Sequence, residues 1–252
     1  MQTRISHITY YVDLKSLYIQ FLGCNLHCPW CIRKLTPWDH HLDKETLVGI
    51  KFQGLLTIEE FKEIINGVKE LEDAVLGGEE PTIDPSLPLI IRILREHNVN
   101  IRLLTNAYEI STELLNELVM CASCEVVVSL KSLNPEVYRR YVGGELNTVL
   151  RNIEKLIGRG IKVIFETVLI PGINGPAEVE EIARYISTIT DKPTLIIDPL
   201  VPIPDTPWRR PTNEEIAEAA RRASKYVNVV MHERGRPSRV VVLYPRVSVK
   251  TN

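Results

Sequence analysis

Residues 16–31 read SLYIQFLGCNLHCPWC, and this stretch decides which fold and which chemistry the chain can support. Its first seven residues are mostly apolar or aromatic and predict a buried strand. Gly23 then releases the chain into a loop. Three cysteines follow in that loop, Cys24, Cys28 and Cys31, at C-x3-C-x2-C spacing. Because thiolates are soft ligands, the loop predicts an iron–sulfur cluster or a zinc site.

The number of ligands separates these two interpretations. Structural zinc takes four protein ligands, and a four-iron cluster of the ferredoxin type is held by four cysteines. This loop offers three cysteines. A cluster held by three thiolates leaves one iron without a protein ligand, and that iron can bind a substrate or a cofactor. A structural zinc knuckle is the alternative interpretation.

The pattern C-x3-C-x-aromatic-C after a first strand resembles the motif of the radical S-adenosylmethionine (SAM) superfamily, matched here by Cys24, Cys28, Trp30 and Cys31. The resemblance implies a [4Fe-4S] cluster on the three cysteines, with SAM bound to the open iron. It implies an oxidoreductase in which the reduced cluster cleaves SAM to a 5′-deoxyadenosyl radical that abstracts hydrogen from a substrate. An electron donor such as ferredoxin or flavodoxin is then needed.

Composition narrows the class of partner. The 252 residues carry 30 Lys and Arg against 32 Asp and Glu. The chain as a whole therefore lacks the positive net charge that is typical of nucleic-acid-binding proteins. Residues 207–252, however, hold ten Lys or Arg and four Asp or Glu. We interpret this excess first as a solvated helix and hairpin. The alternative is a docking face for an acidic partner or for RNA.

The cellular location is also predicted from composition. The first residues lack the apolar stretch of a signal peptide, and no segment approaches transmembrane length. Five cysteines, three of them in one loop, fit a reducing compartment better than a disulfide scaffold. We therefore expect a cytoplasmic protein that does not contact a membrane.

Strand and helix patterns alternate through most of the chain, with connections short enough for right-handed parallel crossovers. This alternation predicts an α/β fold, a partial (β/α)6 TIM-like barrel of parallel strands. We expect a single radical SAM domain over residues 1–252, with a core of about 15–205 and an extension over 206–252. The predicted strands are residues 17–22, 74–76, 100–104, 125–130, 162–170 and 194–200.

Four further segments are predicted besides the barrel strands. Residues 5–12 predict a short strand, either an edge or the hairpin partner of the first barrel strand. Residues 32–53 have no clean period and predict an ordered loop. A helix over 212–226 is predicted from its capping box. Residues 227–232 and 239–244 then predict a terminal hairpin that turns at 235–237.

Unusual residues come after each predicted barrel strand. A parallel barrel places its chemistry at the carboxyl ends of its strands, so we expect these residues to meet at one rim with the cysteine loop. They are Gly77, Gly78 and Glu79, then Thr105 and Asn106, then Ser129 and Lys131, then Pro171 and Gly172, and finally Asp198.

The family resemblance implies roles for them. Gly77 and Gly78 would let backbone approach the methionine part of SAM, and Glu79 would accept a hydrogen bond from its ammonium group. A plain turn is the alternative, and Glu80 separates Glu79 from Pro81, where the family continues directly with proline.

The remaining rim residues divide between SAM and the substrate. Lys131, the candidate catalytic residue, would reach with Ser129 toward the SAM carboxylate, its ribose or the substrate; a solvated lysine is the alternative. Trp30 would lie near the adenine or cover the cluster. Thr105 and Asn106 would form a polar rim, and Pro171 and Gly172 the adenine-side turn.

Residues 129–138, 152–153 and 168–174 resemble the branch of pyruvate formate-lyase-activating enzymes, which activate glycyl-radical enzymes. The resemblance thus implies a glycyl-radical enzyme as partner. Leu104 and Ser129 stand where activases carry aspartates of a cation and substrate site, and leucine cannot ligate a cation. The alternatives are radical SAM modification of RNA, a peptide or a small molecule, and a non-enzymatic zinc or Fe–S interaction module.

The other two cysteines form a C-x-x-C pair, Cys121 and Cys124, between a predicted helix and strand. We interpret them as buried thiols or a stabilising disulfide rather than as a metal or redox pair. We likewise expect His40 and His41 to be loop residues rather than ligands.

Overall fold

The computed structural model describes residues 1–231 and 239–246, and a nine-stranded sheet in the order β8-β7-β6-β5-β4-β3-β2-β1-β9 runs through it. Strands β2 to β8 are all parallel. The sheet curves but does not close, because β8 and β9 are its two edges in the described part of the chain. The parallel strands are β2 (Ser16–Phe21), β3 (Asp73–Gly78), β4 (Asn100–Thr105), β5 (Cys124–Ser129), β6 (Lys162–Leu169), β7 (Thr194–Pro199) and β8 (Asn228–Met231). The predicted partial TIM-like barrel is confirmed.

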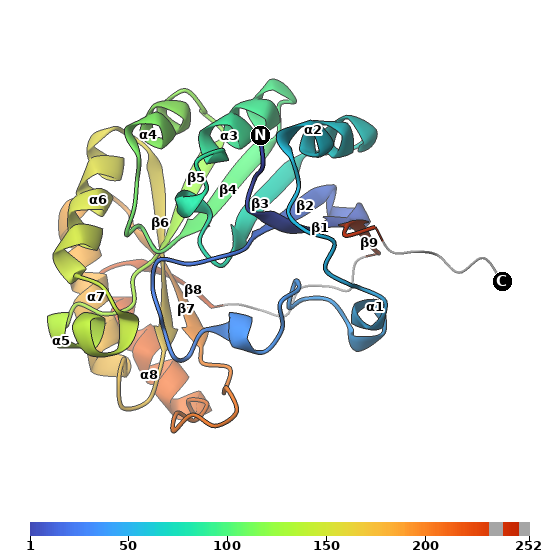
Figure 1. Ribbon diagram of the computed structural model, residues 1–252. Helices are drawn as coiled ribbons and strands as arrows, with labels where there is room; N and C mark the ends of the chain where they lie inside the picture. The colour runs from blue at the N-terminus through green and yellow to red at the C-terminus, as the bar shows by residue number, and fades with distance from the viewer. Residues whose placement is uncertain (232–238, 247–252) are drawn as a thin grey trace.

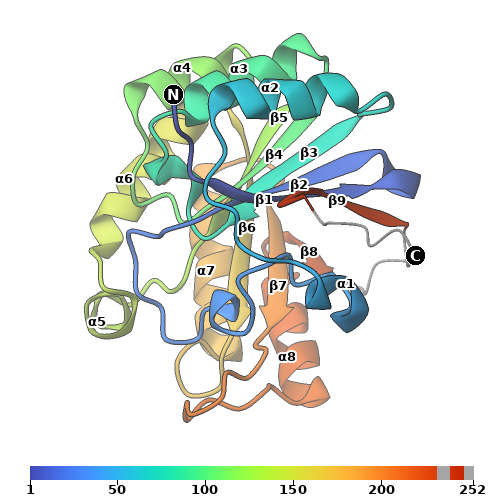
Figure 2. The ribbon, with the colours of Figure 1, turned by 45° about the vertical axis from the view of Figure 1, so that its right-hand side comes forward.

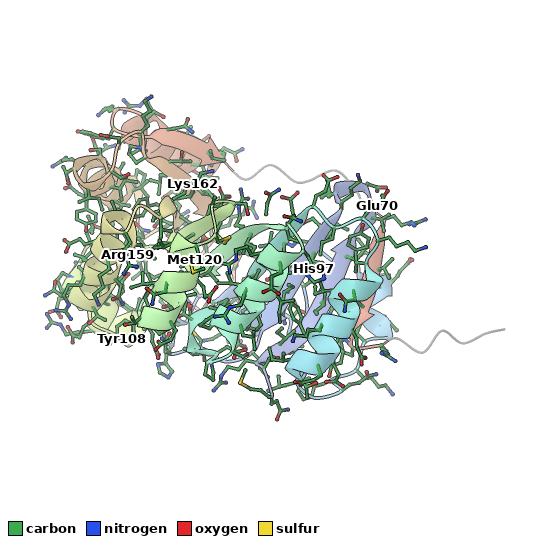
Figure 3. All side chains as sticks on the ribbon, turned by 90° about the horizontal axis from the view of Figure 1, so that it is seen from above. Glu70, His97, Tyr108, Met120, Arg159 and Lys162 are labelled. Atoms are coloured by element: carbon green, nitrogen blue, oxygen red, sulfur yellow. A yellow bond between two sulfur atoms is a disulfide. The ribbon has the colours of Figure 1, made fainter. Side chains whose placement is uncertain are left out.

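Helices cover the outer, convex face of this sheet (Figure 1). Each lies between two parallel strands, as right-handed crossovers require. The long helices are α2 (Ile58–Gly67), α3 (Leu87–Glu96), α4 (Thr112–Val119), α6 (Leu146–Gly158), α7 (Pro176–Ile189) and α8 (Asn213–Ala223). Two short helices, α1 (Lys44–Val48) and α5 (Pro135–Val137), lie in connections. Seen from above, Met120 and Arg159 lie just past the ends of α4 and α6 (Figure 3).

The two faces of the sheet differ in burial. Leu103, Val128 and Phe165 face the helices and are fully buried. Their neighbours on the concave face, Leu104 and Glu166, are half-buried. Because side chains alternate between the faces of a strand, this difference shows that the helix side holds the core. At Leu104 and Glu166 the concave face is therefore the more accessible one, although Val127, which pairs with Leu104, is 2% exposed.

The segment after β2 crosses the concave side before it reaches α1 (Figures 1 and 2). Two contacts fasten it there: Tyr11 donates to Asp39 Oδ2 at 2.5 Å, and the Gln20 amide donates to the Pro37 carbonyl. Burial raises the pKa of Asp39, but hydrogen bonds from His41 and Tyr11 outweigh it and lower the pKa to about 2. The predicted ordered loop is therefore correct over most of its length, except for α1.

The first strand, β1 (Ile5–Tyr11), pairs antiparallel with β2, which confirms the predicted hairpin partner. The predicted terminal hairpin is wrong. β8 pairs in parallel with β7, whereas β9 (Val240–Tyr244) pairs with β1 at the opposite edge. The reason is that α8 precedes β8 and makes a seventh parallel unit. Residues 235–237, the predicted turn, lie outside the described residues.

Basic residues on α8 and just after it form ion pairs with glutamates of α7 and α8. Arg222 contacts both Glu218 and Glu180, and Lys225 contacts Glu180 at 3.0 Å. These exposed pairs are the pattern of a solvated helix face. No helix in the described residues is both long and apolar enough to span a membrane.

Asp84 joins the amino-terminal strand to the start of α3. Its carboxylate is 2% exposed and accepts hydrogen bonds from the Arg4 N–H at 2.6 Å and from the Ser86 N–H and hydroxyl at 2.8 and 2.6 Å. Asp84→Ala should lower the free energy of unfolding by about 3 kcal/mol, because buried donors lose their acceptor. Urea unfolding followed by circular dichroism measures it.

The matched control is Glu63→Ala, which removes an exposed carboxylate from α2. Its unfolding free energy should stay within about 0.5 kcal/mol of the parent protein. Equal stability of the Asp84 and Glu63 variants would contradict the role assigned to Asp84.

Candidate active site

The cysteine loop begins where β2 ends, at the carboxyl edge of the parallel sheet. Cys24 is exposed, Cys28 and Cys31 are half-buried, and all three are free thiols. The other two of the five cysteines, Cys121 and Cys124, form a disulfide where β5 begins, at the opposite edge. The interpretation as a disulfide is thus confirmed over that as free thiols. The loop contains the only free thiols of the chain, since all five cysteines are described.

The environment of the thiols bears on metal binding. Burial raises the pKa of Cys24 to about 11. Burial also raises the pKa of Cys28, although the facing positive charge of Lys131 lowers it in part. A metal that binds the Cys24 sulfur must therefore displace the proton of that thiol.

Two glycines at the end of β3 expose backbone beside this loop. Gly78 has a φ of +98°, and a Cβ there would lie 2.4 Å from Gln20 Cγ and 2.9 Å from the Phe21 carbonyl oxygen. A Cβ on Gly77 would lie 2.9 Å from Leu104 Cδ1. No other residue fits at Gly78 without moving β2. This close approach of β3 to β2 is what glycine permits.

Two carboxylates in succession connect β3 to its neighbours. Glu79 Oε2 accepts a hydrogen bond from the Gly23 N–H at 2.5 Å, at the start of the cysteine loop. Glu80 is 1% exposed and accepts from the Thr105 hydroxyl at 2.6 Å and the Asn106 N–H at 2.7 Å. Thr82 adds its N–H and hydroxyl at 3.1 and 2.7 Å. Burial raises the pKa of Glu80, and these donors oppose the rise.

Asn106 continues this connection into the cysteine loop. Its side-chain amide donates to Asn25 Oδ1 at 2.9 Å and lies 3.7 Å from the Cys24 sulfur. Glu79 and Asn106 therefore bond to the cysteine-loop segment directly, whereas Thr105 bonds to Glu80. Glu80 was missed as a site residue, although its place directly before Pro81 was visible in the sequence.

Lys131 belongs to a polar chain on the concave side. Its ammonium donates to the Ser129 hydroxyl, which donates to Glu166 Oε1 at 3.1 Å. Burial lowers the pKa of Lys131, but the negative charges of Cys28 and Glu166 outweigh it and raise the pKa. The Lys131 ammonium is thus held in a polar chain by the Ser129 hydroxyl. The sequence did not single out Glu166 as a site residue, and its only unusual feature was a charged side chain within an apolar strand.

The turn after β6 is arranged differently from the other strand ends. Gly172 is exposed, and a Cβ there would meet nothing within 4 Å. Asn174 is buried instead and donates to the Thr167 hydroxyl and the Val168 carbonyl, both at 2.8 Å. In the described part of the chain, no hydrogen bond joins Pro171 or Gly172 to the cysteine loop.

The other flank of the cysteine loop packs on a second glycine pair. A Cβ on Gly143 would lie 2.9 Å from His27 Nδ1, and one on Gly144 would lie 2.8 Å from Leu26 Cδ2. The His27 N–H also donates to the Val142 carbonyl at 2.8 Å. The sequence interpretation overlooked this pair, and two adjacent glycines in the connection after the predicted strand 125–130 were the available signal.

Comparison with known proteins identifies the family of this chain. Residues 18–186 match the radical SAM superfamily. The chain belongs to the radical SAM superfamily. Its members use a [4Fe-4S] cluster with SAM, so the cofactors expected from the cysteine loop are those of its family.

Two curated relatives differ in activity. The chain is 31% identical over 157 residues to a probable GTP 3′,8-cyclase of Methanococcus aeolicus, which covers 60% of this chain and 49% of the relative. It is 26% identical over 213 residues to a putative glycyl-radical enzyme activating enzyme of Methanocaldococcus jannaschii, covering 82% and 76%. The chain therefore spans about half the length of the cyclase that it matches.

Among solved structures, Streptococcus suis SuiB bound to S-adenosylmethionine superimposes with a TM-score of 0.66. The alignment covers 83% of this chain and 48% of SuiB, at 13% sequence identity. At this identity the likeness shows the fold alone.

The residues present fit the family cofactors. Three free thiols in one loop supply the soft ligands of a cluster and leave one iron open. The crowded positions at Gly77 and Gly78 let the end of β3 lie against the end of β2, where that loop begins. Cys24, Cys28 and Cys31 would hold the cluster, and the β3 end would face a ligand of the open iron.

Replacing any one loop cysteine by alanine should abolish stable cluster binding. Anaerobic reconstitution should load about four irons per chain in the parent protein and less than about one in each variant. Iron analysis and the visible absorption spectrum measure this. The double variant Cys121→Ala/Cys124→Ala is the control and should retain its iron. Full iron in a loop variant, or zinc in place of iron in the parent, would overturn the assignment.

Glu80→Ala should both destabilise the protein and loosen the cysteine loop. The buried donors of Thr82, Thr105 and Asn106 lose their acceptor, which should cost about 3 kcal/mol of unfolding free energy. Iron loading should fall because Asn106 no longer holds Asn25.

Chemical unfolding and iron analysis measure both effects of the Glu80 variant. The exposed carboxylate of Glu109 serves as control, since Glu109→Ala should change neither quantity. A Glu80 variant with parental stability would show that the buried carboxylate does not support this rim.

Proposed function

We propose that this protein is a radical SAM oxidoreductase that removes a hydrogen atom from a substrate on the concave side of the sheet, and that its substrate is a glycyl-radical enzyme. The observation that carries the proposal is the set of three free thiols in one loop, without a fourth cysteine, beside the glycine pair of β3. Such a loop leaves one iron of a cluster for SAM.

The cluster and SAM, when bound, supply a 5′-deoxyadenosyl radical by one-electron reductive cleavage. The protein supplies position. Glu79 and Glu80 hold the cysteine loop and the β4 end together through Gly23 and Asn106. Lys131, held by Ser129, places a positive charge opposite the cysteines, suited to a carboxylate of SAM or of the substrate.

Two observations support an activase-like reaction. The activating-enzyme relative aligns over most of both chains, unlike the cyclase. The concave face is also half-exposed and bounded by two separate sheet edges, which suits a protein segment as substrate. Leu104 and Ser129 occupy the positions where activases carry aspartates. Ser129 instead accepts from the Lys131 ammonium, so a fixed positive charge lies there.

A second candidate is chemistry on a guanine nucleotide. It is favoured by the relative at 31% identity, a probable GTP 3′,8-cyclase. Both candidates share the same first step and differ only in the donor of the hydrogen atom.

The shared first step is tested with the reconstituted protein, dithionite and SAM. We expect 5′-deoxyadenosine and methionine to form in equal amounts, measured by liquid chromatography and mass spectrometry. The Cys28→Ala variant should form neither product, because its cluster does not assemble. A parent protein that holds a full cluster yet leaves SAM intact would refute the proposed function.

The substrate is tested by deuterium transfer into 5′-deoxyadenosine. A peptide from a glycyl-radical enzyme, dideuterated at its glycine Cα, should transfer deuterium if activation is correct. GTP deuterated on its ribose is the parallel sample. Transfer from GTP alone would replace the activase proposal by the nucleotide reaction.

A further inference from the structure

Three aromatic side chains from distant segments meet over the cysteine loop. The ring of Trp30 lies 5.5 Å from that of Trp208 and 6.1 Å from that of Tyr141, and the latter two are 6.1 Å apart, as distances between centroids. We call Trp30, Tyr141 and Trp208 the aromatic cap. Trp208 comes from the long connection between β7 and α8, which has no role in the site described above.

The aromatic cap leads from the cluster ligands to the surface. Trp30 lies between Cys28 and Cys31 in the chain and is 5% exposed. Tyr141 and Trp208 pack against it and are themselves partly exposed. Only the side chains of Tyr141 and Trp208 therefore separate Trp30 of the cysteine loop from the molecular surface.

Three positive residues lie next to members of the aromatic cap, in space or in the chain. The Lys34 ammonium donates to the Pro29 carbonyl at 3.3 Å, and the Arg140 guanidinium carbon lies 5.3 Å from the centre of the Tyr141 ring. Arg210 follows Trp208 by two residues and is exposed. We call Lys34, Arg140 and Arg210 the basic rim.

The charge of the basic rim is not neutralised within the protein. Neighbouring arginines are paired, Arg139 with Glu136 and Arg209 with Glu215. Among residues 1–231 and 239–246, by contrast, no carboxylate lies within ion-pair distance of a rim residue. An aromatic centre inside an unpaired basic rim is typical of a site for a negatively charged protein.

We propose that the aromatic cap and the basic rim form the docking surface for an acidic one-electron donor protein. The inference rests on the proposed function, which requires an electron at the cluster. In the step, the reduced donor loses one electron, the cluster gains it, and no bond is made or broken in either protein. Docking here brings the donor's redox centre to the surface layer nearest the three cysteines.

Complementary charge decides how fast such a partner associates. It raises the association rate by about 10- to 1,000-fold at low ionic strength, and salt removes the effect. Transient redox complexes bury little area, so charge around a small aromatic centre suffices for a specific contact. Dithionite, a small reductant, needs no such surface. The two reductants therefore separate docking from chemistry.

The experiment uses the triple variant Lys34→Glu/Arg140→Glu/Arg210→Glu in the reconstituted protein, with purified flavodoxin, its reductase and NADPH as donor. Formation of 5′-deoxyadenosine should fall at least about tenfold with flavodoxin at low salt. With dithionite it should stay within about twofold of the parent. Quenching of tryptophan fluorescence by oxidised flavodoxin, an independent measure of binding, should weaken in parallel.

A charge-matched control reverses three exposed positive residues in or just after the helices α2 and α6, namely Lys62, Lys69 and Arg159. Figure 3 labels Arg159. It should keep the parental rate with both reductants. Equal losses with flavodoxin and dithionite in the rim variant, or an equal loss in the control, would overturn the docking surface. Competition of tRNA with flavodoxin for the parent but not for the rim variant would also overturn it, in favour of RNA. Failure of the parent with dithionite would instead refute the proposed function.

Discussion

The buried carboxylate of Glu80 is the constraint on which the candidate site depends. It lies at the end of β3, is almost wholly shielded from solvent, and accepts hydrogen bonds from Thr105 and Asn106 at the end of β4. A buried carboxylate is stable only when its oxygens are satisfied. The β4 end must therefore stay in place, and Asn106 then holds Asn25 and approaches Cys24. One buried charge thus fixes the position of the loop that carries the three free thiols.

The parallel sheet explains why a few hydrogen bonds are enough to hold the cysteine loop in place. Parallel strands bring their carboxyl ends to one edge, so residues far apart in the chain become neighbours without dedicated packing. The opposite edge carries the Cys121–Cys124 disulfide and charged pairs such as Arg102 with Glu125. The candidate site therefore lies at the carboxyl edge of the strands, and these stabilising contacts lie at the amino edge. The open curvature leaves the concave face accessible between them.

Expectations from the sequence were most accurate where local pattern and topology agree. The six barrel strands were predicted from apolar runs between helical patterns, and each coincides with one of β2 to β7. The site residues were predicted from the polar residues and glycines directly after each run. The terminal hairpin failed because β8 and β9 carry the same local pattern as a hairpin. Their pairing depends on free edges on opposite sides of the sheet, which no local signal encodes. Glu80 looks like an interruption in the sequence, because only burial reveals that a carboxylate accepts several hydrogen bonds.

The sequence by itself determined the cofactor chemistry, since three cysteines at this spacing provide three soft ligands whatever surrounds them. It also determined the order of strands and helices, because periodicity is a local property. Only the tertiary structure decided which carboxylate supports the loop, that Ser129 links Lys131 to Glu166, and that Trp208 packs against Trp30. These depend on contacts between distant segments. Burial and electrostatic fields arise only after the chain has folded.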